Sequence, residues 1–115
     1  MITKEFFQLC KTGTVDKIYQ FFDRNNVTYE ALFEPYGIIS TILIHGLLHA
    51  IDQENYDVGN FLVDQFQITN NDLNLVLWEI KNIVHRTPGW SGPHDTPPWS
   101  SRRSEWLKIK FGILL

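Results

Sequence analysis

Apolar residues recur every three or four positions along most of this chain, which is the spacing of the buried face of an α-helix. The spacing is clearest from Val15 to Phe22 and from Leu73 to Val84, where polar residues fill most other positions. We therefore predict helices over residues 3–11, 14–23, 38–53, 56–66 and 70–85, a short segment over 28–34, and a last helix that ends near residue 110. The pattern predicts an all-α domain, built as a small array or bundle of helices.

Capping residues stand at the expected ends of these helices. Threonine and serine side chains can accept a hydrogen bond from the first backbone N–H groups of a helix, and glycine suits the position just after its end. The residues that fit these roles are Thr14, the pair Thr69 and Asp72 as a capping box, Ser101 or Ser104 before the last helix, and Gly112 after it.

Residues 87–101 break the helical pattern. This stretch holds four of the five prolines of the chain and has no apolar periodicity, so we expect a long loop. Aromatic and cationic residues gather in it and just after it, and such residues are enriched where proteins bind partners. The partner-binding candidates here are Trp90, His94, Trp99, Arg102 and Arg103. In the alternative, Trp90 and Trp99 fold back to cover the helical core.

Length and composition narrow the class of protein. The 115 residues suit one domain, and a hydrophobic fraction of 43% is ample for a packed core. The net charge of −3 argues against a nucleic-acid or anionic-membrane binder, which needs a basic surface. The apolar stretch over residues 38–51 is shorter than a membrane span, the N-terminus lacks a signal-peptide pattern, and the lone Cys10 forms no internal disulfide. We expect a cytoplasmic protein.

His45 and His49 are the most suggestive residues for metal chemistry. They stand four positions apart on an expected helix, so both imidazoles share one face and could bind a divalent metal. Gly46 occupies the position where the zinc-hydrolase pattern has its glutamate base, and a third ligand would have to come from His85 or from His94 and Asp95. A metal-dependent hydrolase is therefore one alternative. In the other, the two histidines belong to the polar side of an amphipathic helix.

Two stretches of the chain show a weak internal repeat. Leu47, Ala50, Val58 and Leu62 are spaced like the ankyrin repeat, and the set Phe6, Gly13, Ile18, Phe21 and Phe22 matches the same pattern more loosely. Residues 4–67 thus resemble two degenerate ankyrin-repeat units, which implies stacked helix pairs. The offset of about 41 residues exceeds the usual spacing of about 33, and the T-P-L-H tetrapeptide of the family is absent.

The sequence contains no complete catalytic motif and no phosphate-binding loop, so we expect no cofactor and favour a non-enzymatic role. The leading hypothesis is a protein-interaction module that inhibits or neutralises a partner, such as a bacterial toxin or an effector enzyme. Acidic residues that include Asp52 and Asp57 would meet a basic partner and speed the encounter. A structural homo-oligomer, with a homodimer formed through the apolar C-terminus, is a further alternative.

Overall fold

The computed structural model describes residues 2–37, 40–85 and 102–113, and these residues form helices with one small hairpin. The helices in chain order are α1 (Ile2–Thr12), α2 (Val15–Asn25), the 3₁₀ helix η1 (Tyr29–Phe33), α3 (Ile42–Asp52), α4 (Tyr56–Phe66), α5 (Asn70–Asn74), α6 (Leu77–His85) and α7 (Arg102–Phe111). Between η1 and α3, the strands β1 (Pro35–Tyr36) and β2 (Ser40–Thr41) pair antiparallel. The prediction of an all-α array is confirmed.

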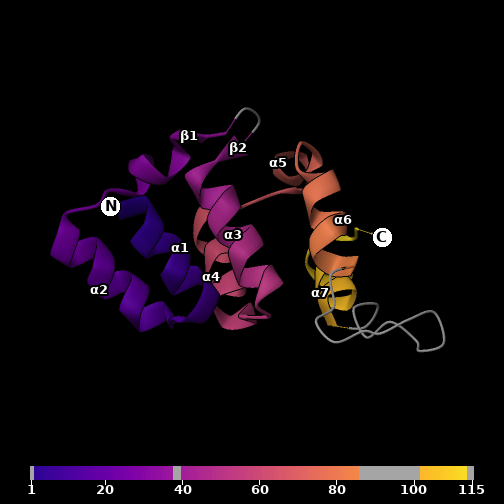
Figure 1. The fold of residues 1–115 in the computed structure, drawn as a ribbon, viewed down its shortest axis with the longest axis horizontal. Helices are drawn as coiled ribbons and strands as arrows, with labels where there is room; N and C mark the ends of the chain where they lie inside the picture. The colour runs from indigo at the N-terminus through magenta and orange to yellow at the C-terminus, as the bar shows by residue number, and fades with distance from the viewer. Residues whose placement is uncertain (1, 38–39, 86–101, 114–115) are drawn as a thin grey trace.

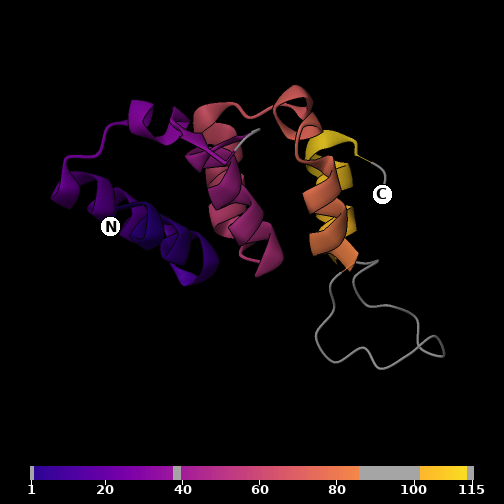
Figure 2. The ribbon, with the colours of Figure 1, turned by 45° about the horizontal axis from the view of Figure 1, so that its top comes forward.

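The longer helices lie in pairs that follow one another along the molecule (Figures 1 and 2). The pair α1 and α2 occupies one end, α3 and α4 the middle, and α6 and α7 the other end. Helix α3 contacts α1, α4, α6, η1 and both strands, so it lies at the centre of the fold. The hydrophobic core runs through these pairs, and its largest fully buried side chains include Phe6, Ile18, Phe21, Leu43, Leu47, Leu62, Leu73, Ile80 and Leu107.

Three helix ends follow the predicted capping chemistry. The hydroxyl of Thr14 accepts from Lys17 N at 3.2 Å, and Asp72 Oδ2 accepts from Thr69 N at 2.8 Å as in a capping box. Gly112 follows α7 with φ +68° and donates its N–H to Lys108 O at 2.8 Å. Because these contacts span only three or four residues, the local sequence was enough to place them.

Two predicted helices differ from the structure. The helix expected from residue 38 begins at Ile42, because Thr41 is its N-cap and accepts from Ile44 N at 3.3 Å. The helix expected over 70–85 is interrupted between α5 and α6, where Leu75 lies in a turn and Val76 N donates to Leu73 O. The predicted cap Ser104 lies inside α7, and the other predicted cap, Ser101, is outside the described residues.

Trp106 joins α7 to α4. Its ring lies 5.6 Å from the ring of Tyr56, centroid to centroid, and its Nε1 donates to Asn60 Oδ1 at 3.0 Å. Gly59 leaves room for this ring, since a Cβ there would lie 3.2 Å from Trp106 Cζ2. The half-buried Trp106 therefore packs against the core.

Candidate functional site

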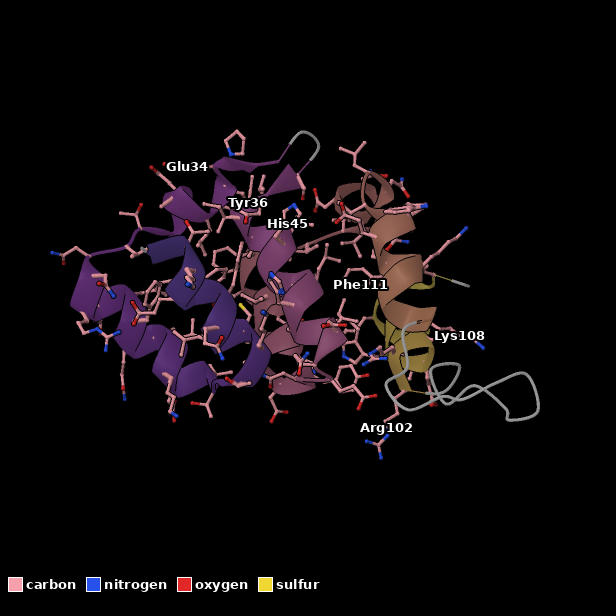
Figure 3. All side chains as sticks on the ribbon, viewed as in Figure 1. Glu34, Tyr36, His45, Arg102, Lys108 and Phe111 are labelled. Carbon is pink, nitrogen blue, oxygen red and sulfur yellow. The ribbon has the colours of Figure 1, made fainter. Side chains whose placement is uncertain are left out.

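The two histidines of α3 lie in a small aromatic cluster rather than on an open polar face. The ring of His49 lies 4.7 Å from Phe7 of α1, and the ring of His45 lies 4.8 Å from Tyr36 of β1. Tyr36 in turn meets Phe7 edge to face at 5.1 Å, so four rings from three elements form a continuous chain of contacts. Figure 3 shows Tyr36 and His45 together where the hairpin meets α3.

This environment changes the acid–base behaviour of His49. Partial burial lowers the pKa of the His49 imidazole below its ordinary value, and the nearby charges of Lys11 and of His45 lower the pKa further. Asp52 acts in the opposite direction, but with a smaller effect on the pKa. The neutral imidazole, packed against the Phe7 ring, is therefore the favoured form of His49 near neutral pH.

The geometry around these histidines bears on the metal hypothesis. Within residues 2–37, 40–85 and 102–113, no group of three or more His, Cys, Asp or Glu side chains is placed to hold a metal ion. The suggested third ligands His94 and Asp95 lie outside the described residues, as does the side chain of His85. The prediction of a metal site therefore stays a prediction.

Gly46, which stands between the two histidines, marks the closest approach of α1 and α3. A Cβ at Gly46 would lie 2.5 Å from Phe6 Cε2 and 3.1 Å from Cys10 Sγ, so even alanine would require a shift of the core. Cys10 is fully buried, and burial raises the pKa of its thiol. A glutamate base at position 46 is incompatible with this packing.

The predicted partner-binding arginines face the rest of the chain. Arg103 donates from Nη2 to Asp52 O at 2.6 Å and from Nε to Ile51 O at 3.3 Å, so it binds the last carbonyls of α3. Arg102 Nη1 lies 4.0 Å from Glu54 Oε2 in an exposed ion pair. Arg103 thus contacts Asp52, another predicted partner-binding residue, through the backbone carbonyl of Asp52 at the C-terminal end of α3.

Of the remaining predicted partner-binding residues, Asp57 is the one that the structure describes, and it borders a different part of the surface. Asp57 is exposed near the start of α4 and borders a hollow that Asp16 and Asn55 also line. Trp90, His94 and Trp99 lie outside the described residues.

A second hollow lies at the N-terminal end of α3. Its volume is about 210 Å³. Phe33 of η1 and Phe66 of α4 contribute rings that meet edge to face at 6.0 Å, and Leu75 lies on the opposite, α5 side. The remaining lining residues are Ser40, Thr41, Leu43, Ile44, Ile68, Asn71 and Asp72.

Large apolar side chains are exposed at and near this hollow. Phe33 is 53% exposed and Leu75 64%, and Trp78, three residues further along, is 74% exposed. None of the three was predicted from the sequence as a partner-binding residue. A signal for two of them was present, because Leu75 and Trp78 lie off the buried face formed by Leu73, Val76 and Ile80. For Phe33, the short segment offered no periodicity to place it.

Comparisons with known proteins gave no match, either to a protein-family model, to a curated protein or to a solved structure. Among the described residues, no helix is long and apolar enough to cross a membrane.

Proposed function

We propose that this chain is a non-enzymatic protein-interaction module that binds another protein and thereby inhibits or neutralises it, with a bacterial toxin or an effector enzyme as the kind of partner. The observation that carries the proposal is the exposure of Phe33 and Leu75 in the lining of the hollow at the N-terminal end of α3, together with the exposure of Trp78 three residues after Leu75. Clustered exposed apolar side chains mark interaction sites on monomeric proteins, and tryptophan is among the commonest binding hot spots.

The fold supports the same proposal. The pairs α1–α2 and α3–α4 stand side by side, an arrangement that suits the stacked units implied by the resemblance to ankyrin repeats. An array of stacked helix pairs presents an extended surface with little need for a deep active site. The ankyrin-like relationship is part of the proposal.

The test is capture of the partner from the native host by the tagged chain. The double variant Leu75→Ser and Trp78→Ser is expected to reduce the recovery of the partner by about tenfold or more, which corresponds to about 1.4 kcal/mol of binding free energy. Its melting temperature should stay close to that of the wild type, because both side chains are exposed. Addition of the wild-type chain to the purified partner should lower the partner's activity.

Ile109 provides the matched control. It is as exposed as Trp78, at 74%, but lies on α7, and Ile109→Ser should leave the capture unchanged. Equal recovery by the double variant and the wild type would contradict the proposed binding surface. A captured partner whose activity does not change on addition of the chain would contradict the inhibitory role.

The exposure of Ile109 also favours a second candidate function, a structural homo-oligomer. Ile109 lies on α7 between Lys108 and Lys110. Contact with a second copy of the chain would bury its exposed apolar side chain. Light scattering should then give a mass above 13.5 kDa that Ile109→Ser returns to that of a monomer.

A further inference from the structure

The charges of this chain are distributed unevenly. Between Arg24 and Lys81 the sequence contains eight Asp or Glu residues and no Lys or Arg, so residues 25–80 carry a formal charge of −8. This stretch includes η1, the hairpin, α3, α4 and α5, the elements that line or border the hollow at the N-terminal end of α3. A chain with a net charge of only −3 therefore concentrates its negative charge in its middle pair of helices and the elements around it.

Among the described residues, some of these carboxylates form ion pairs and others do not. Glu54 and Asp64 lie 4.0 Å and 3.5 Å from Arg102 and Lys110 of α7, and neither carboxylate lines the hollow. Asp72 does line it, and other carboxylates stand on the bordering elements. Among the described residues, no ion pair is found for Glu30, Glu34, Asp72 or Glu79.

The partial charges at the helix ends do not change the sign of the electrostatic potential around the hollow. Helix α3 begins at the hollow and α4 ends there, since Thr41 and Phe66 are both in the lining. A helix start carries a partial positive charge and a helix end a partial negative charge of similar size, so the two contributions oppose each other. The carboxylates then set the sign of the potential, which is negative.

The size of the hollow restricts what it can hold. A volume of about 210 Å³ lies below the range of about 300–1,000 Å³ that is typical of small-molecule sites. It suits a single large apolar side chain, which the Phe33 and Phe66 rings and Leu75 would surround. Insertion of one anchor residue into such a pocket is how many protein interfaces obtain most of their binding energy.

We propose that this hollow docks a basic segment of a partner protein, with one large apolar side chain inserted among Phe33, Phe66 and Leu75 and with a flanking Lys or Arg residue facing Asp72. The proposal rests on the interaction function proposed above, and it adds the chemistry of the partner. Charge complementarity carries it, because the elements around the hollow hold carboxylates and no Lys or Arg.

The probes are three blocked peptides, acetyl-Lys-Phe-Lys-amide, acetyl-Glu-Phe-Glu-amide and acetyl-Lys-Ala-Lys-amide, titrated separately into ¹⁵N-labelled full chain and followed by NMR. The first should shift the amide signals of Thr41, Asn71 and Leu75 in a saturable way, with an affinity about fivefold or more above that of the other two. Raising the salt from about 0.05 M to about 0.5 M should reduce this preference, because exposed charges are screened.

Two protein variants form a matched pair. Asp72→Asn removes an exposed carboxylate that lines the hollow but keeps a side-chain oxygen to accept from Thr69 N, while Asp57→Asn removes an exposed carboxylate near the start of α4, away from the hollow. Asp72→Asn should weaken binding of the Lys-flanked peptide by about twofold to threefold, and Asp57→Asn should leave it unchanged. Leu75→Lys places a cation at the hollow and should abolish the binding.

Several results would overturn the proposal. Equal affinity for the Lys-flanked and Glu-flanked peptides would remove the charge preference, and shifts that map away from the hollow would remove the site. If the amide signals of the hollow shift with the concentration of the free chain, and these shifts disappear in Ile109→Ser, the occupant of the hollow is a second copy of the chain instead. If capture of the partner depends on Leu75 and Trp78 but the peptides do not discriminate, this inference fails while the interaction function stands. If the peptides discriminate but no partner is captured, the preference of the hollow for a basic segment stands while the proposed interaction function fails.

Discussion

Helix α3 has a closed end and an open end. At its C-terminal end, Arg103 of α7 binds the carbonyls of Ile51 and Asp52, and Arg102 pairs with Glu54. At its N-terminal end, α3 borders a hollow whose lining includes the exposed Phe33 and Leu75. The arginines of α7 cover the C-terminal end, whereas exposed apolar side chains and the carboxylate of Asp72 lie at the N-terminal end. The comparison distinguishes residues whose contacts stabilise the fold, at the C-terminal end of α3, from exposed residues at its N-terminal end, which we propose bind a partner.

The largest effect is expected at the closed end. Replacement Arg103→Met removes two hydrogen bonds from a charged group to the last carbonyls of α3, and should lower the free energy of unfolding by about 2 kcal/mol. Arg102→Met is the matched control, because the Arg102 side chain is 76% exposed and its pair with Glu54 is long, so it should cost less than about 1 kcal/mol. Urea denaturation of both variants gives the comparison. Equal losses would mean that α7 is held by general charge attraction rather than by Arg103.

This contrast also separates what the sequence could predict from what it could not. The caps at Thr14, at Thr69 with Asp72, and at Gly112 depend on contacts three or four residues apart, and all three were predictable. The contact from Arg103 to Ile51 spans 52 positions, and nothing in the local pattern distinguishes Arg103 from Arg102. Both arginines were therefore predicted as partner-binding residues, although the fold gives them different surroundings.

The open end was harder to predict, because it is formed by a turn and a hairpin that the apolar spacing of the sequence does not mark. The apolar spacing of Leu73, Val76 and Ile80 continues across the turn between α5 and α6, so one helix was expected where there are two. The hairpin before α3 was missed for a similar reason, since an apolar run that includes Ile42 and Leu43 extends the helical pattern back over it. The hollow requires both features and could not be placed without the tertiary fold.

The histidine cluster, which lies along α3 between its two ends, should make stability depend on pH. The folded-state pKa of His49 is lower than its unfolded value of about 6.5, so the neutral form stabilises the fold. This contribution is fully present above the unfolded pKa and is lost as the pH falls through it toward the folded pKa. The loss cannot exceed about 1.4 kcal/mol per pH unit for one proton.

Urea denaturation between about pH 7.5 and about pH 5 measures this dependence. The variant His49→Gln should flatten the decrease in stability, whereas His45→Gln should retain most of it, because burial is the main cause of the lowered His49 pKa. A decrease of the same slope in His49→Gln and in the wild type would assign the pH dependence to other groups. The charges of Arg102 and Arg103 at the closed end do not change over this pH range, because arginine does not titrate there.

The smallest effect is expected at the open end and should have the opposite sign to that of Arg103→Met. Ser40 lines the hollow, and its hydroxyl oxygen is buried with no hydrogen-bond partner among the described residues. A buried hydroxyl without a partner loses its hydration, so Ser40→Ala should leave the free energy of unfolding unchanged or raise it by up to about 1 kcal/mol. The neighbouring Thr41→Val removes a hydroxyl that caps α3 and should instead cost about 1 kcal/mol. Urea denaturation that gives equal losses for these two adjacent variants would show that the Ser40 hydroxyl does stabilise the open end.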